Sequence, residues 1–135
     1  MNRIAIRTLR RPRLLAHLFL WGLCVAGPAF SKAKYPRTQT GTAVYYADRL
    51  DGREVALHGE KYDKNALTAA QNRYPLGSTV KVTNLRNQKS VTVKINDRMN
   101  RRSKAVIDLS RKAAEDLDMI RRGHVRVRLQ LVRTQ

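Results

Sequence analysis

The sequence is poor in cysteine, in acidic residues and in long apolar runs, and each shortage excludes a class of protein. Cys24 is the only cysteine among 135 residues, so the chain cannot form an internal disulfide framework. It holds 10 acidic residues against 28 lysines and arginines, which gives a formal net charge of +18. Its main apolar stretch, residues 14–27, is shorter than the about 20 residues of a membrane-spanning helix. Without repeats or low-complexity tracts, the length indicates one domain.

The first 33 residues follow the three-part order of a secretory signal peptide. Five arginines and no acid precede the apolar stretch, and small residues follow it, which predicts cleavage at about residues 31–33. An uncleaved anchor is the alternative, and Arg10-Arg11 gives only a weak twin-arginine pattern. Leu23 stands before Cys24, where a lipoprotein signal needs a small residue, so we do not expect a lipid anchor. We therefore expect a periplasmic or secreted protein with no stable membrane insertion after cleavage.

The rest of the chain remains strongly basic. Six of the 28 basic residues and no acidic residue lie in the first 33 positions, so residues 34–135 contain 22 basic and 10 acidic residues. Such a field favours polyanionic partners, namely nucleic acid, anionic lipid or acidic cell-wall polymers. The signal peptide and the lack of an RNA- or DNA-binding motif argue against nucleic acid. A cell-wall polymer is the partner that fits an exported protein.

Hydrophobic periodicity predicts mostly strands. Alternating or β-rich runs cover residues 42–47, 80–83, 91–95 and 124–132, and a further short strand is possible at residues 54–56. Residues 66–71 are compatible with one helical turn, and Ser110 has the chemistry of an N-cap for a helix with an apolar face at Ala113, Ala114 and Leu117. About six short strands and one helix predict a small β-barrel or a compact mixed-β domain. We expect a polar lead-in at residues 34–40 and the domain at residues 41–133.

The segment VTVKINDRMNRRSKAVID, residues 91–108, concentrates the candidate chemistry. A half-buried strand pattern leads to Asp97, a basic loop follows, and a second apolar run ends at Asp108. Carboxylates at the ends of buried strands beside a cationic loop indicate a ligand cleft. The alternative is a charged loop in which Arg98 pairs with Asp97, since structural ion pairs give the same pattern.

Seven segments resemble the rare lipoprotein A family in collinear order: GTAVYY, DGREVA, HGEKYD, ALTAAQ, YPLGSTVKVTNL, VTVKINDR and VIDLSRKAA, within residues 41–132. The resemblance implies a mainly β fold, a six-stranded double-psi β-barrel with one or two short helices. It also implies an endolytic lytic transglycosylase that cleaves the bond between N-acetylmuramic acid and N-acetylglucosamine in peptidoglycan and leaves 1,6-anhydro ends. We expect peptidoglycan glycan strands as the partner, no cofactor or metal ion, and a monomer.

The resemblance also assigns site residues. It places the family's catalytic glutamate, histidine and aspartate positions at Glu60, Gln71 and Asp97. Glutamine exchanges hydrogen bonds but cannot titrate, so residue 71 has lost an imidazole that can carry a proton. His58, two positions before Glu60, is a candidate replacement, although we favour a solvent-facing loop histidine. Asp108 is interpreted as a structural residue at a strand-to-helix junction.

Cationic and aromatic residues complete the expected site. The candidates for substrate binding are Tyr62 and the arginines Arg98, Arg101 and Arg102, which suit the carboxylates of a glycan strand. Met99-Asn100 replaces the Gly-Pro usual in the family, and the glutamate loop is one residue longer. Together with Gln71, these departures keep a second function open, a non-catalytic peptidoglycan-binding or wall-loosening module.

Overall fold

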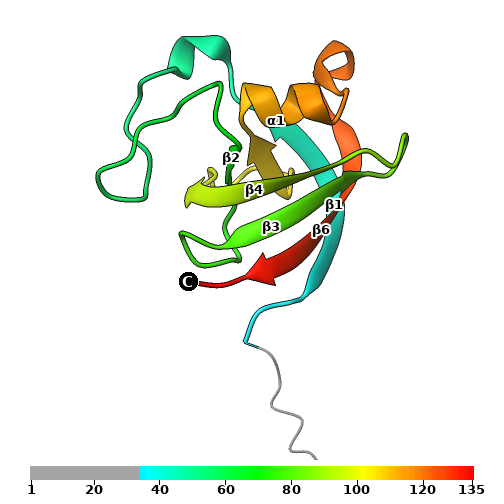
Figure 1. Cartoon of the computed structure of the whole chain (residues 1–135), viewed down its shortest axis with the longest axis horizontal. Helices are drawn as coiled ribbons and strands as arrows, with labels where there is room; N and C mark the ends of the chain where they lie inside the picture. Colours follow the sequence, from blue (N-terminus) through cyan, green and yellow to red (C-terminus); the bar gives the residue numbers. More distant parts are fainter. Residues whose placement is uncertain (1–33) are drawn as a thin grey trace, which may run out of the picture. The chain divides into compact units, whose positions relative to one another are not determined.

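The described part of the chain is a closed six-stranded barrel. The computed structural model describes residues 34–135, so the predicted signal peptide and Cys24 lie outside the described residues. The strands follow one another around the barrel in the order β1-β5-β2-β4-β3-β6 (Figure 1). The elements, in chain order, are β1 (Thr38–Tyr45), η1 (Asp48–Leu50), β2 (Thr68–Ala70), β3 (Thr79–Asn84), β4 (Ser90–Asp97), β5 (Ile107–Leu109), α1 (Arg111–Asp116), η2 (Ile120–Arg122) and β6 (Val125–Arg133).

Pairing between distant strands closes the barrel. β6 runs antiparallel to both β1 and β3, and β3 forms an antiparallel hairpin with β4. Two pairs are parallel, β1 with β5 and β2 with β4. The strand predicted at residues 124–132 is confirmed as β6: Val125, Val127 and Leu129 are buried, whereas Arg126 and Arg128 between them are exposed. One face of this strand therefore supplies the core and the other carries charge.

Three local predictions differ from the structure. The helical turn predicted at residues 66–71 is wrong, because Thr68–Ala70 is β2, held between β4 and β5. Glu54 forms only an isolated bridge with Lys61 instead of a short strand. β1 begins at Thr38, inside the expected lead-in, because residues from Thr38 onward pair with β6. For β1 and β2, pairing with a segment remote in sequence overrides local preference.

The helix after β5 follows the prediction from its cap. The Ser110 hydroxyl accepts from the Ala113 backbone N–H at 3.2 Å and donates to the Ala66 carbonyl at 2.6 Å. The first bond caps α1, and the second ties α1 to the segment before β2. Ala113, Ala114 and Leu117 are fully buried, as predicted. The helix thus fixes the chain that leaves β5 against the barrel.

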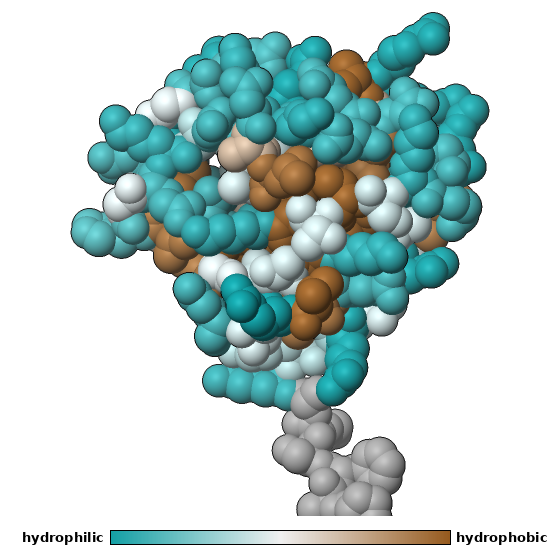
Figure 2. Space-filling model, in the orientation of Figure 1, coloured by the Kyte–Doolittle hydropathy of each residue, from teal (hydrophilic) through white to brown (hydrophobic). Residues whose placement is uncertain are grey.

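A compact apolar core lies under a hydrophilic surface. The largest fully buried side chains come from different strands and from the segment after β2, and include Tyr74, Ile95, Ile107, Leu109 and Leu129. In Figure 2, hydrophilic side chains frame a central apolar area on the face shown. Within residues 34–135, no helix has the length and apolar character needed to span a bilayer.

Candidate functional site

Asp97 ends β4 and is almost completely buried, with 5% of its surface exposed. Its Oδ1 accepts hydrogen bonds from the backbone N–H groups of Ala56 at 2.9 Å and Arg98 at 2.8 Å. Its Oδ2 accepts from the Tyr46 hydroxyl at 2.6 Å. All three partners donate, which suits an ionised carboxylate because that form only accepts. The prediction that Asp97 stands at the end of a buried strand is confirmed.

Two stacked tyrosines support this carboxylate. The Tyr46 and Tyr62 rings lie 4.6 Å apart between centroids, at an interplanar angle of 26°. Burial, and the hydrogen bond to Asp97, raise the pKa of Tyr46 well above its usual range, so its hydroxyl stays protonated as a donor. Tyr62 is 3% exposed, and its hydroxyl accepts from the Arg111 backbone N–H at 3.2 Å. The ring of Tyr62 therefore packs behind Tyr46 and is almost closed to solvent.

Asp108 lies in the middle of β5, half-buried, with its Oδ1 enclosed and without a hydrogen-bond partner. Burial, and secondly the charge of Asp97, raise the pKa of Asp108 to about 6. The carboxyl opens on a hollow of about 280 Å³, here called the Asp108 hollow. Its lining residues are Tyr46, Leu50, Arg53, Arg98, Met99, Asn100, Ser103 and Asp108.

Glu60 lies in a separate hollow of about 210 Å³, here called the Glu60 hollow, lined by Glu54, Val55, His58, Gly59, Glu60 and Lys61. Its carboxylate pairs with the Lys94 ammonium through one oxygen, and the other accepts from Asn96 Nδ2 at 3.1 Å. The hydrogen bond from Lys94 is the main cause that lowers the pKa of Glu60. His58 is exposed in the same hollow.

Asp97 links the two hollows by hydrogen bonds. It accepts from Ala56, which follows the Val55 that lines the Glu60 hollow, and from Tyr46, which lines the Asp108 hollow. Its neighbour in β4, Asn96, bonds to Glu60. The structure thus brings Glu60 and Asp97 to the same end of β4, although each carboxylate has its own set of partners.

Gln71 contributes its backbone to this end of the barrel and turns its side chain elsewhere. Its N–H donates to the Asp97 carbonyl at 3.1 Å. Its side chain is 1% exposed, and Oε1 accepts from the backbone N–H groups of Arg73 at 2.6 Å and Tyr74 at 2.8 Å. Nε2 donates to Gln39 Oε1 at 3.2 Å. The amide therefore braces the turn after β2.

The three candidate arginines differ in freedom. Arg98 donates through Nη1 to the carbonyls of Gln71 at 2.5 Å and Tyr74 at 2.6 Å, and it also lines the Asp108 hollow. The alternative in which Arg98 pairs with Asp97 through its guanidinium is not what the structure has, since only its backbone N–H bonds to that carboxylate. Arg101 and Arg102 are exposed in the loop before β5.

The arrangement offers groups suited to proton transfer. Within residues 34–135, no three His, Cys, Asp or Glu side chains gather closely enough to hold a metal ion. The described site instead has one carboxylate supplied with donors, Asp97, and one carboxyl deprived of them, Asp108. Neighbouring acids whose environments separate their pKa values are typical of acid–base sites. The sequence predicts Asp108 at the end of an apolar run beside a cationic loop, where we interpreted it as a structural residue; its unpartnered Oδ1 is visible only in the structure.

Fold and site together define a small β-barrel with a carboxylate cluster at one end, and comparison with known proteins identifies its family. The model of the family described as lytic transglycolase matches residues 38–129. The chain belongs to this family.

Curated relatives share the same region. The chain is 42% identical over 95 residues to the endolytic peptidoglycan transglycosylase RlpA of Neisseria meningitidis, covering 70% of this chain and 39% of that protein. It is 45% identical over 101 residues to the protein of the same name from Pasteurella multocida, covering 73% of this chain and 34% of the relative. The chain therefore spans less than two-fifths of the length of these relatives. The identity of the relatives agrees with the resemblance to the rare lipoprotein A family.

Solved structures confirm the fold. The Streptomyces papain inhibitor superposes with a TM-score of 0.58 at 25% identity, covering 73% of this chain and 97% of that one. An expansin of Clavibacter michiganensis superposes with a TM-score of 0.57 at 18% identity, covering 73% and 52%. The predicted six-stranded double-psi β-barrel is confirmed.

Proposed function

We propose that the protein is exported and cleaves peptidoglycan glycan strands by lytic transglycosylation. Family membership supports the reaction class, and relatives named as endolytic peptidoglycan transglycosylases support the substrate and an envelope location. The observation that carries the proposal is the pair of Asp97, whose oxygens accept three hydrogen bonds, and Asp108, whose enclosed Oδ1 accepts none. Export rests on the signal-peptide pattern at residues 1–33, with cleavage at about residues 31–33.

In the proposed reaction Asp108 is the proton donor. Its protonated carboxyl gives a proton to the glycosidic oxygen as the bond from that oxygen to the muramic acid C1 breaks. Positive charge then develops on the sugar ring, and the carboxylate of Asp97 stabilises it. The sugar's 6-hydroxyl attacks C1, and its proton passes to the carboxylate that Asp108 has become. Asp108 thereby recovers its proton, and the product is a 1,6-anhydro end formed without consumption of water.

The residues assigned by resemblance keep distinct roles in this proposal. Glu60, charged and paired with Lys94, accepts hydrogen bonds from sugar hydroxyl or amide groups in its hollow. Gln71 acts through its backbone, which supports the end of β4 next to Asp97. Arg101 and Arg102 bind carboxylates of the strand, and Arg98 and Tyr62 hold the site's shape.

One observation favours a second function, a non-catalytic peptidoglycan-binding module. Gln71 stands where the family has histidine, and its amide is committed to Arg73, Tyr74 and Gln39. If the imidazole is indispensable for proton transfer in this barrel, the chain retains the glycan surface and lacks the reaction.

One experiment separates the two functions. Protein beginning near residue 34 is incubated with purified peptidoglycan, and the products are analysed by mass spectrometry for 1,6-anhydro-muropeptides. We expect such products with wild type and none with Asp97→Asn, the matched control, because an amide cannot balance the developing charge. Binding to peptidoglycan without anhydro products from wild type would establish the binding module and reject the enzyme.

A further inference from the structure

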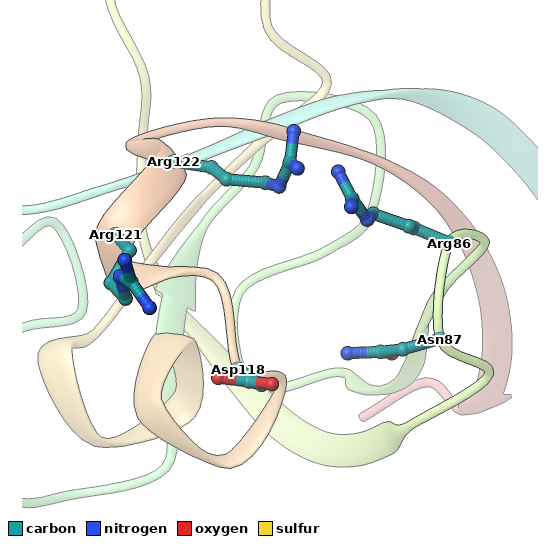
Figure 3. Close-up of a pocket in the computed structure, with 5 residues that line it drawn as sticks. All are labelled: Arg86, Asn87, Asp118, Arg121 and Arg122. Atoms are coloured by element: carbon teal, nitrogen blue, oxygen red, sulfur yellow. The ribbon is translucent and has the colours of Figure 1, made fainter.

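A third hollow lies at the opposite end of β4 from Asp97. It has a volume of about 450 Å³ and is lined by Arg86, Asn87, Asp118, Arg121 and Arg122 (Figure 3). We call it the arginine hollow. Arg86 and Asn87 belong to the connection between β3 and β4, Asp118 follows α1, and Arg121 and Arg122 belong to η2. Three arginines therefore share this hollow with one carboxylate and one amide.

The arginines of this hollow have no anionic partner among residues 34–135. The ion pairs found there leave out Arg86, Arg121 and Arg122, and Asp118 contacts only Lys89, at 3.8 Å, with both side chains mostly exposed. Figure 3 shows Arg86 and Arg122 extending their guanidinium groups toward one another across the hollow. Like charges directed at one shared space repel each other weakly in water, and an anion between them converts that repulsion into attraction.

The walls of the hollow are held in place by two side-chain amides, one of them buried. Asn84 and Asn87 both donate through Nδ2 to the Leu117 carbonyl, at 2.9 and 3.1 Å, and thereby tie the β3–β4 connection to the end of α1. Within the connection, Asn84 Oδ1 accepts from the Arg86 N–H at 3.0 Å and Asn87 Oδ1 accepts from the Lys89 N–H at 2.9 Å. The arginines thus project from a braced scaffold, which lowers the entropy lost when a ligand binds.

We propose that the arginine hollow is a second binding subsite for carboxylate groups of peptidoglycan, remote from the site of cleavage. This inference rests on the proposed function for its choice of polymer. β4 separates the two places: Ser90 follows the connection that carries Arg86, and Asp97 ends the strand. Seven steps of about 3.3 Å put them roughly 23 Å apart. Planar guanidinium groups match carboxylates in pairs of parallel hydrogen bonds, which makes arginine the suited residue.

Two sources in peptidoglycan offer this chemistry. Glycan stripped of peptide carries a free lactyl carboxylate on each muramic acid, whereas glycan with peptide stems carries the carboxylates of the stems, and some stems also carry an amino group. Asp118 discriminates between them. Its carboxylate repels a purely anionic strand and attracts an ammonium group, so Asp118→Asn should strengthen binding of the first and weaken binding of the second.

The test measures binding separately from cleavage. All proteins carry Asp97→Asn, which prevents turnover, and calorimetry compares them on peptide-free glycan, on the same glycan with its carboxylates amidated, and on a soluble stem peptide. The triple substitution Arg86→Gln, Arg121→Gln and Arg122→Gln should weaken binding of a carboxylate-bearing probe about tenfold and leave amidated glycan unaffected. Double substitution Arg126→Gln and Arg128→Gln, on the exposed face of β6, is the control for lost charge.

Every outcome bears on the subsite. If the triple variant binds both carboxylate probes as the β6 double variant does, or weakens amidated glycan equally, the arginine hollow is not a carboxylate subsite. Failure of the proposed function is detected by a different assay, the analysis for anhydro products. A wild-type chain that yields no such products can still bind carboxylates in the arginine hollow. Circular dichroism checks that the triple variant folds, which we expect because all three arginines are exposed.

Discussion

Glu60 and Asp108 are two carboxyl groups on either side of Asp97, and their surroundings are opposite. Glu60 stands on a loop, paired with Lys94 and bonded to Asn96, and these partners lower its pKa. Asp108 stands inside a strand, deprived of partners at one oxygen, and burial beside Asp97 raises its pKa to about 6. The two hollows thus contain one carboxyl whose pKa is lowered and one whose pKa is raised.

Partners and burial, and not residue type, thus decide which of the two carboxyl groups holds a proton more readily. Glu60 has the position that the resemblance makes catalytic, but its ion pair favours the form that cannot donate a proton. Asp108 has the opposite balance. Substitutions at each carboxyl test the proposed difference between them.

Asp108→Asn should have the largest effect. Loss of the proton donor should lower kcat on purified glycan by about 10²–10⁴-fold. The same change should raise the free energy of unfolding at pH 8 by about 1–2 kcal/mol, because it removes the charge of a half-buried carboxyl. The gain is this small because solvent screens a partly exposed group. Chemical denaturation and anhydro-product release measure the two effects. Asp116→Asn, on the exposed face of α1, is the control, and a stability loss in Asp108→Asn would mean a structural role.

Activity should depend on pH through the same group. Because Asp108 donates a proton, kcat/KM should fall about tenfold per pH unit above about pH 6. Stability should fall in the same direction: between the unfolded pKa near 4 and the folded pKa near 6 the folded state binds more protons, so the free energy of unfolding decreases as pH rises. Rates and denaturation midpoints at pH 4.5 to 8 check both. A rate that rises through pH 6 would transfer the acid role away from Asp108.

Glu60→Gln should have a smaller effect. Loss of a charged acceptor for the sugar should raise KM, and lower kcat/KM about tenfold, with little change in kcat. Steady-state kinetics on glycan fragments measures the split, with Glu54→Gln in the same hollow as the control. If Glu60→Gln removes kcat while Asp108→Asn retains it, the two carboxyl groups exchange roles.

Gln71→His should change least. Its side chain braces the turn at Arg73 and Tyr74, and an imidazole nitrogen can replace one of the two acceptor contacts. We expect kcat within about twofold of wild type, since in this account residue 71 carries no proton. Gln71→Ala, which leaves two backbone donors without a partner, should lower the free energy of unfolding by about 1–3 kcal/mol. A large gain of activity in Gln71→His would show that the proton is carried by an imidazole at residue 71 and not by Asp108.

Local patterns predicted the parts of the fold that local chemistry controls. Alternation in β6 and the cap at Ser110 lie within one segment each, so the sequence contains their cause. β2 was missed because Thr68–Ala70 is extended only through pairing with β4 and β5, which lie far along the chain. The double-psi architecture came from the resemblance and not from periodicity, and the order of the strands around the barrel came from the structure alone.

The candidate site divides in the same way. The resemblance selected Asp97, and the structure gives it a partner set that no sequence pattern contains: a tyrosine from after β1 and a backbone N–H from residue 56. Asp108 was interpreted as structural, because the sequence does not show that its Oδ1 lacks a hydrogen-bond partner in the folded protein. Gln71 was judged by its side chain, whereas its backbone contact to Asp97 is the feature next to the site.

The position of β6 between β1 and β3 has a consequence for the order of events in the cell. β1 pairs with β5 and with β6, and β3 also pairs with β6, so the barrel closes only after β6 has been synthesised. Contacts this distant in sequence form slowly, because a long loop must close before they are gained. Under the export proposed above, we therefore expect the chain to cross the membrane before the barrel closes and to acquire its carboxylate site only on the far side.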